Sequence, residues 1–181
     1  MSNILYRNIV LVFFLVVKLT MTTNKSDTCC PEFNTKLWDE KTHVWKDKLF
    51  LKDEVKQIFH VPLNMGKIIT RMWQQVDNAQ ASPKTEEFLI LAYDPSPWKS
   101  ELYMTITKEI PNANIVKLTG TFVSKVFDGP YQAVPQWLSK MDNFLSNQNQ
   151  KSLKYYIHYA YCPKCAKKYG HNYGIVFAQV K

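Results

Sequence analysis

The residues with the clearest capacity for chemistry are the four cysteines, which occur as two pairs far apart in the chain. Cys29 and Cys30 are adjacent and precede Pro31, whereas Cys162 and Cys165 form a C-x-x-C sequence. A C-x-x-C turn brings two thiolates to one side, a spacing that suits tetrahedral zinc. We therefore expect the fold to gather all four cysteines into one site, with a structural zinc ion as the first interpretation.

Two other uses of these cysteines remain open. Two disulfides between the pairs are expected if the chain is exported, because disulfides persist in oxidising compartments. A redox-active C-x-x-C is the other use, since Lys164, Lys167 and Lys168 would offset thiolate charge and lower the pKa values of the thiols.

Glu101 is the candidate catalytic group. It precedes the alternating run 102–107, with Trp98 before it and Tyr103 after it. A carboxylate beside aromatic rings can have a raised pKa and act as a general acid or base. The alternative is an exposed glutamate at the end of a strand.

Aromatic residues make up 14% of the chain, which is enough to fill a core and also to line a cleft for flat or apolar ligands. In the tyrosine-rich run 155–161, His158 shares a strand face with Tyr156. Trp38, Trp45 and His158 are therefore candidate ligand-binding residues. The two tryptophans could equally fasten the amino-terminal segment to the domain.

Regular elements must position these groups. Residues 42–51, 55–61, 88–93 and 102–107 are short runs of strand-forming residues. Residues 65–80, between the second and third of these runs, have the spacing of a helix. The apolar stripe of that helix consists of Ile69, Met72, Trp73 and Val76.

The second half repeats this order of elements. Residues 115–127 are predicted as a strand, 132–145 as a helix, and 154–161 and 173–180 as strands separated by a cysteine-bearing loop. We predict an α+β fold of two strand–helix–strand–strand modules within a single domain, residues 28–181. Two antiparallel sheets would lie side by side, with the helices packed on one face and a groove between the modules as the natural pocket.

The composition is that of a globular protein, with 46% hydrophobic and 21% charged residues. The formal net charge is +8, but Arg7 and Arg71 are the only arginines and the lysines are spread along the chain. Because base and phosphate readout favours the guanidinium group, no specific nucleic-acid partner is expected. The sequence has no Gly-rich phosphate loop, no G-x-S-x-G and no H-E-x-x-H, which excludes several enzyme classes.

Residues 1–27 are expected to lie outside the fold as an apolar leader or extension. The unbroken apolar run 9–17 is too short for a stable membrane span, which needs about 20 residues. The run fits the apolar region of a signal peptide, although no pair of small residues for cleavage follows it. Translation from Met21 would give a cytoplasmic protein, whereas a functional leader would make the protein secreted or membrane-associated.

Two stretches of sequence resemble a known family. Residues 126–131, Val-Phe-Asp-Gly-Pro-Tyr, followed by a predicted helix, resemble the F-[ED]-G-P-Y segment of GyrI-like small-molecule-binding domains, which have two strand–helix–strand–strand modules. The Cys-Cys-Pro segment and residues 162–173 look more closely like a group of short, mostly bacterial proteins labelled GyrI-like or hydrolase. The similarity covers residues 28–180.

The resemblance implies a pocket for a hydrophobic, aromatic or cationic small molecule, built from aromatic side chains and a carboxylate. The positions it indicates are Glu101, Tyr103 and Tyr131. It also implies hydrolysis of hydrophobic, electrophilic compounds in detoxification. The competing hypothesis is a protein without catalysis, either stabilised by zinc or acting as a thiol-redox interaction protein.

Overall fold

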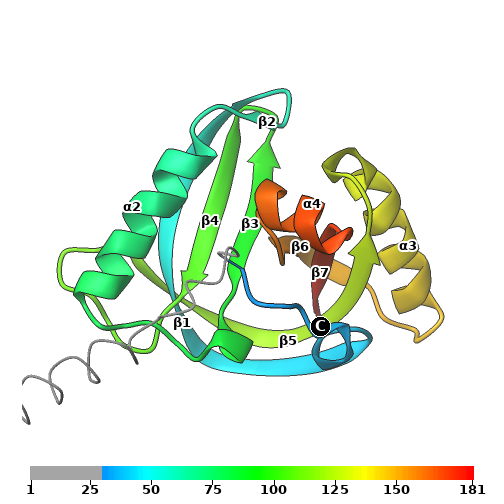
Figure 1. Cartoon of the computed structure of the whole chain (residues 1–181). Helices are drawn as coiled ribbons and strands as arrows, with labels where there is room; N and C mark the ends of the chain where they lie inside the picture. Colours follow the sequence, from blue (N-terminus) through cyan, green and yellow to red (C-terminus); the bar gives the residue numbers. More distant parts are fainter. Residues whose placement is uncertain (1–29) are drawn as a thin grey trace, which may run out of the picture.

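A long first strand organises the fold. β1 (Lys41–Ile58) has 18 residues and merges the two runs predicted at 42–51 and 55–61. In this computed structural model, which describes residues 30–181, its first part pairs with β5 (Ile115–Asp128) and its second part with β4 (Lys99–Thr105) (Figure 1). A register shift between Trp45 and Lys48 marks a bulge, which bends a strand and lets β1 serve both halves.

The two halves have the predicted order of elements. After β1, the first half contains β2 (Val61–Pro62), α2 (Met65–Asn78), β3 (Ile90–Ser96) and β4. The second half contains β5, α3 (Val134–Ser146), β6 (Ser152–Tyr159), α4 (Pro163–Tyr169) and β7 (Tyr173–Val180). Within residues 30–181, three short 3₁₀ helices lie at Thr35–Leu37, Thr85–Glu87 and Tyr131–Ala133. The predicted α+β fold of two strand–helix–strand–strand modules is therefore confirmed.

The strands form one sheet rather than the two side-by-side sheets expected. Their order is β2-β1-β4-β3-β6-β7-β5, and the pairing of β1 with β5 closes the sheet on itself. The two modules are joined by hydrogen bonding of β3 to β6, in which Leu91 lies opposite His158. All the strand pairs are antiparallel. The closed sheet consequently has an inner face and an outer face.

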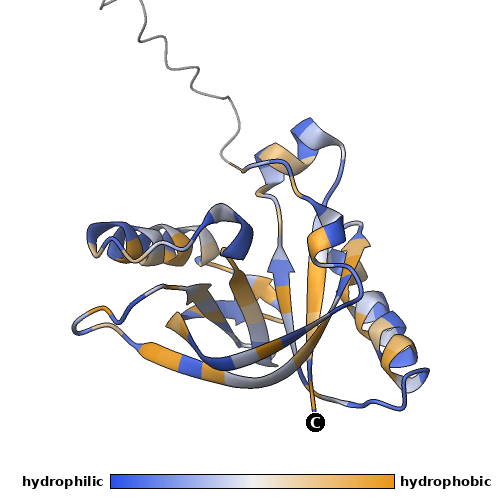
Figure 2. Ribbon diagram, turned by 90° about the horizontal axis from the view of Figure 1, so that it is seen from below, coloured by the Kyte–Doolittle hydropathy of each residue, from blue (hydrophilic) through white to orange (hydrophobic). Residues whose placement is uncertain are grey.

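The helices α2 and α3 cover the outer face, which confirms that they pack on one side of the sheet. Both helices carry hydrophobic and hydrophilic residues in alternation (Figure 2). In α3 the buried residues are Trp137, Met141 and Leu145. In α2 they are Ile68, Met72 and Val76, so the predicted stripe is rotated by part of a turn and Trp73 remains 46% exposed.

The predicted loop between the last two strands is wrong, because it contains α4. Pro163 stands in the first turn, and Gly170 ends the helix in the left-handed region with φ of 73°. Proline at a helix start and glycine just past its end are the usual signals for such a helix. The seven-residue helix carries both cysteines of the C-x-x-C sequence at or near its start.

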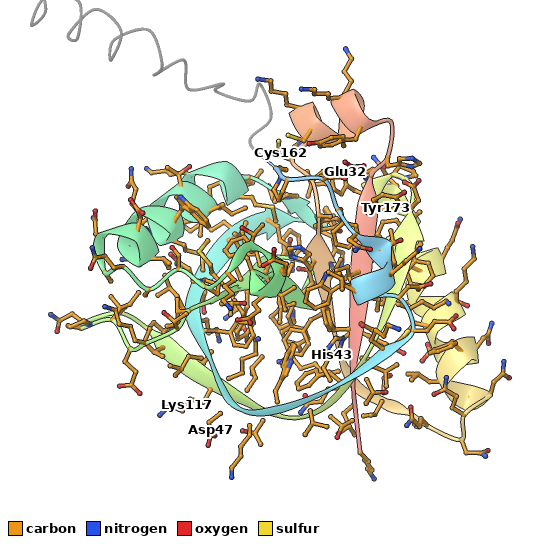
Figure 3. All side chains as sticks on the ribbon, turned by 60° about the horizontal axis from the view of Figure 1, so that its bottom comes forward. Glu32, His43, Asp47, Lys117, Cys162 and Tyr173 are labelled. Atoms are coloured by element: carbon orange, nitrogen blue, oxygen red, sulfur yellow. The ribbon has the colours of Figure 1, made fainter. Side chains whose placement is uncertain are left out.

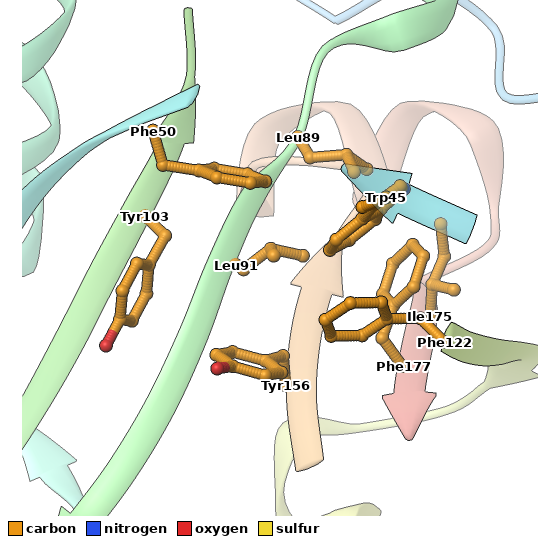
Figure 4. Packing of buried hydrophobic residues seen from close by; sticks show 9 residues of the cluster. All are labelled: Trp45, Phe50, Leu89, Leu91, Tyr103, Phe122, Tyr156, Ile175 and Phe177. Carbon is orange, nitrogen blue, oxygen red and sulfur yellow. The ribbon is translucent and has the colours of Figure 1, made fainter. Parts of the chain in front are cut away.

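Large apolar side chains fill the inner face. The cluster is shown in Figure 4 and consists of Trp45, Phe50, Leu89, Leu91, Tyr103, Phe122, Tyr156, Ile175 and Phe177. The hydroxyl groups of Tyr103 and Tyr156 point in the same direction, away from Trp45 and Leu89 (Figure 4). The inner face therefore has an apolar end and a polar end.

The predicted leader, residues 1–27, lies outside the described residues. Within residues 30–181, no helix combines the length and apolar character required to cross a membrane.

Candidate ligand site and cysteine cluster

Glu101 lies on the inner face of β4 and is enclosed by hydrogen bonds. Its carboxylate accepts a hydrogen bond of 2.5 Å from the Tyr103 hydroxyl and lies 3.0 Å from Lys52 Nζ. Lys99 Nζ is 3.4 Å away. The side chain is only 12% exposed. Glu101 is therefore a built part of the inner face and not the exposed strand-end glutamate considered as an alternative.

The pKa of Glu101 shifts in the direction opposite to that expected. Burial alone would raise the pKa of this carboxyl group, but the hydrogen bonds from Tyr103 and Lys52, with the nearby lysine charges, lower it to about 2. Burial, together with the adjacent carboxylate, raises the pKa of Tyr103 above its ordinary range. At neutral pH the pair is therefore a carboxylate with a neutral phenol that donates to it.

Three tyrosine rings from three strands meet beside this carboxylate. The Tyr103 and Tyr156 rings are perpendicular, with centroids 5.6 Å apart, and Tyr93 lies 5.8 Å from Tyr156. Lys154 Nζ stands over the Tyr93 ring, 3.6 Å from its centroid. We call Glu101, Tyr93, Tyr103, Tyr156 and Lys154, with Lys52, the inner-face site.

Cross-strand register places most of this site. Lys52 on β1 lies opposite Tyr103 on β4, and Tyr93 on β3 lies opposite Glu101. Opposed residues in an antiparallel pair point to the same face, which brings these groups together. The sequence analysis found Glu101 and Tyr103 and missed Tyr93, Tyr156, Lys52 and Lys154. The run 155–161 suggested Tyr156, but no local signal pointed to the lysines.

The two predicted tryptophans are part of the aromatic packing. Trp45 is 8% exposed and stacks on Phe122, with centroids 4.1 Å apart. Trp38 packs edge-on against Phe177 at 5.8 Å, and its carbonyl accepts a hydrogen bond from Ser124. The Trp38 contacts fasten the amino-terminal segment to the sheet, whereas Trp45 is itself a residue of β1 and packs in the core. The ligand-binding roles predicted for both tryptophans stay predictions.

His158 and Tyr131 lie apart from Glu101. His158 is buried, and its Nδ1 accepts a 3.0 Å hydrogen bond from the Ile90 N–H. Burial lowers the pKa of His158 to about 4, so the ring is neutral at physiological pH. Tyr131 packs edge-on against Tyr159 and is 41% exposed. The ligand-binding roles predicted for these two residues stay predictions.

Three of the four cysteines converge. The Sγ atoms of Cys30, Cys162 and Cys165 all lie within 4.8 Å of one another, and Cys29 lies outside the described residues. Figure 3 shows Cys162 beside α4 with Glu32 near it, whereas His43 lies toward the opposite end of the molecule. Sulfur ligands about 2.3 Å from a tetrahedral zinc ion are roughly 3.8 Å apart, so these three residues are close enough to bind one metal ion.

Several contacts hold the segment around Cys30 against α4. The Cys162 N–H donates to Cys30 Sγ at 3.4 Å, and the Tyr169 hydroxyl donates to the Cys30 carbonyl at 3.0 Å. Phe33 N–H donates to the Tyr161 hydroxyl at 2.9 Å. Burial raises the pKa of the Cys30 thiol to about 12. Such a protonated thiol would become a thiolate only if a metal ion or another positive charge compensated it.

Comparison with known proteins identifies one family. The family model described as "Bacterial hydrolase" matches residues 20–180. Among curated proteins, none matches the chain.

Several solved structures share the fold at low sequence identity. An uncharacterised conserved protein from Listeria innocua has a TM-score of 0.60 at 10% identity, covering 79% of this chain and 92% of that one. The C-terminal domain of EcmrR has a TM-score of 0.61 at 12% identity, covering 80% and 98%. SAV2435, solved bound to tetraphenylphosphonium, has a TM-score of 0.51 at 11% identity, covering 79% and 94%.

Proposed function

The chain belongs to the Bacterial hydrolase family, and we propose that it binds hydrophobic or aromatic small molecules at the inner-face site. The observation that carries this proposal is the meeting of three tyrosine rings from β3, β4 and β6 around one ionised, largely buried carboxylate. Aromatic walls with few, well-placed polar groups are typical of small-molecule sites. A core without a ligand role would gain nothing from burying charged groups there.

The comparison with SAV2435 supports this proposal. That protein has the same fold and was solved with tetraphenylphosphonium, a cation with four phenyl rings. A similar fold with an aromatic-rich inner face is therefore compatible with binding of an aromatic compound. The GyrI-like subgroup is the finer assignment that we propose within the family.

We further propose that the bound compounds include electrophiles that the protein hydrolyses. The family description and the position of Glu101 support this step. With a pKa of about 2, Glu101 is ionised and is a weak general base, so turnover that depends on it is expected to be slow. Its ionised form also excludes it as a general acid at neutral pH.

Binding is tested by isothermal titration of the purified chain with a panel of hydrophobic compounds. Tyr93→Ala removes a wall of the inner-face site and should weaken binding about tenfold or more, since one stacked ring contributes 0.5–1.5 kcal/mol beyond its buried area. Tyr155→Ala is the control, because Tyr155 lies on the opposite face of β6 and contacts Asp142. Equal affinities of the two variants, or no binding by any compound, would contradict the proposal.

Glu101→Gln should abolish any hydrolysis while leaving binding detectable.

The cysteine cluster supports a second proposal, a structural zinc site in which Cys29 is the fourth ligand. A site with four sulfur ligands is closed and does not catalyse. Its role would be to attach the amino-terminal segment to α4. The thiol-redox alternative uses the same cysteines, but they would form reversible disulfides instead of binding a metal ion.

Native mass spectrometry of the full chain separates these possibilities. A mass increase of one zinc ion that disappears in Cys165→Ser, with four thiols protected from alkylation, is the expected result. Removal of the ion by a chelator should lower the melting temperature. If the chain contains no metal and its mass is lower by two hydrogens per disulfide, and reductant reverses this change, the zinc proposal is contradicted and the thiol-redox alternative is supported.

A further inference from the structure

We propose that the inner-face site selects aromatic anions over aromatic cations, because the side chain of Lys154 already places an ammonium group among its tyrosine rings. This inference rests on the proposed binding function and names the class of ligand. The positive charge that lies among these rings is thus that of Lys154, a residue of the protein itself.

The geometry of Lys154 is that of a cation held by aromatic rings. Its Nζ lies 3.6 Å from the Tyr93 ring centroid, 4.9 Å from that of Tyr156 and 5.9 Å from that of Tyr103. All three distances fall within the roughly 6 Å over which an ammonium group is attracted to a ring face. A ligand cation that used these rings would have to displace Lys154 and remain close to its charge, so we expect this chain to differ in charge preference from SAV2435, which was solved with an aromatic cation.

The carboxylate that would otherwise attract a cation is already compensated. Glu101 lies 3.0 Å from Lys52 Nζ and 3.4 Å from Lys99 Nζ, and Lys99 also pairs with Glu54 at 2.9 Å. This region contains the ammonium groups of Lys52, Lys99 and Lys154 and two carboxylates, those of Glu54 and Glu101. One positive charge is therefore in excess.

Lys154 is the member of this group that lacks an opposite charge in contact. Among residues 30–181 it takes part in no ion pair, and rings rather than carboxylates surround its Nζ. Burial has the largest effect and lowers the pKa of Lys154, the charge of Glu101 raises it by less, and Lys52 lowers it by less still. A ligand carboxylate would provide the missing opposite charge while its rings replaced the lysine stem against Tyr93 and Tyr156.

A series of three naphthyl compounds tests the selection by charge. Naphthoate, naphthylmethanol and naphthylmethylammonium share one ring system and differ in charge. Isothermal titration of the full chain is expected to show naphthoate binding at least about tenfold more tightly than naphthylmethylammonium, since contact with opposite or like charge differs by more than that factor near a protein surface. Naphthylmethanol should bind with intermediate affinity.

Three variants assign the effect to one ammonium group. Lys154→Met keeps an unbranched apolar stem and should remove the preference for naphthoate or reverse it. Lys154→Arg keeps the charge and should keep the preference. Lys151→Met, which removes an exposed lysine three residues before Lys154, changes the net charge equally and should leave the preference intact.

The outcomes distinguish the two levels of the proposal. If none of the three compounds binds, the proposed function itself fails. If naphthylmethanol binds but the two charged compounds bind equally, or the cation binds best, the site exists and the charge selection is overturned. An equal loss of preference in Lys154→Met and Lys151→Met would likewise overturn it, because the effect would then come from net charge alone.

Discussion

A neutral histidine is buried on the inner face. His158 is 8% exposed, and its Nδ1 accepts the N–H of Ile90 on the neighbouring strand. Because the pKa falls from 6.5 to about 4 on folding, the unfolded chain binds a proton at this position more readily than the folded chain does. The contribution to stability is therefore complete above pH 6.5 and is lost as the pH falls from 6.5 towards 4.

This linkage predicts a change in the acid sensitivity of a variant. His158→Asn retains a side-chain oxygen as an acceptor for the Ile90 N–H and removes the titrating ring. We expect the wild type to lose on the order of 3 kcal/mol more unfolding free energy than the variant between pH 7 and pH 4. Urea denaturation at a series of pH values measures the difference, and parallel curves for the two proteins would contradict the assignment.

At the scale of residues, the sequence predicts neighbours along a strand better than neighbours across strands. Glu101 and Tyr103 are two residues apart, so their shared face follows from the strand period. Lys52 and Lys154 reach them through the register of β1 and through the joining of β3 to β6. Register depends on the whole closed sheet. The predicted direction of the pKa shift of Glu101 was wrong because the Tyr103 hydroxyl donates to its carboxylate and because Lys52, which register brings close, stabilises the ionised form as well.

Between elements, α3 approaches the backbone of β7 closely at Gly174. A Cβ atom placed on Gly174 would lie 2.4 Å from a carbon of the Trp137 ring, which is 3% exposed. Glycine at this position lets the tryptophan lie directly on the strand backbone. The contact fixes how α3 sits on the outer face of the sheet.

Two substitutions of glycine by alanine should therefore have opposite effects. Gly174→Ala forces the Trp137 ring to move and is expected to destabilise the protein by about 1–3 kcal/mol. Gly66→Ala is the control: it lies in α2 with nothing within 4 Å of the added Cβ, and alanine favours helix by up to about 1 kcal/mol. Thermal unfolding of both variants measures the effects. A Gly174→Ala protein as stable as the wild type would contradict the close packing of α3.

Element types were predictable, whereas some of their faces were not. The helical spacing of α2 was visible, yet the buried stripe at Ile68, Met72 and Val76 follows a strict interval of four residues that the apolar pattern blurred. Trp73 is part of the apolar pattern in the sequence, but its side chain is not buried. The short helix α4 was missed because its seven residues, which begin at Pro163 and are followed by Gly170, carry too little periodicity to exceed the turn signals around them.

Over the whole molecule, closure of the sheet creates both candidate sites. The bulge in β1 is held by Thr119 of β5, whose Oγ1 accepts from the Asp47 N–H at 2.9 Å and donates to the Asp47 carboxylate at 3.0 Å. Asp47 takes a positive φ of 50° there. With both halves of β1 paired, the sheet curves and encloses the aromatic inner face. The convergence of Cys30 with Cys162 and Cys165 likewise needs contacts between the two ends of the chain.

The two-module order could be predicted because the same elements repeat along the chain. The single closed sheet could not be predicted, since strand pairing between the modules leaves no local signal in the sequence. The convergence of the cysteines was predicted from residue type and from the spacing within the two pairs, and three of the four are found together. Whether these cysteines bind a metal ion depends on pH and on the metal ions available, as well as on the fold.

The most direct test of the inner-face site is nuclear magnetic resonance of the chain with isotope-labelled tyrosine rings during a titration with naphthylmethanol. The resonances of Tyr93, Tyr103 and Tyr156, whose rings form one group on the inner face, should shift together. Those of Tyr155, beside Asp142, and Tyr169, beside Cys30, should stay in place. Saturating shifts at Tyr155 or Tyr169 with none at the first three would contradict the account.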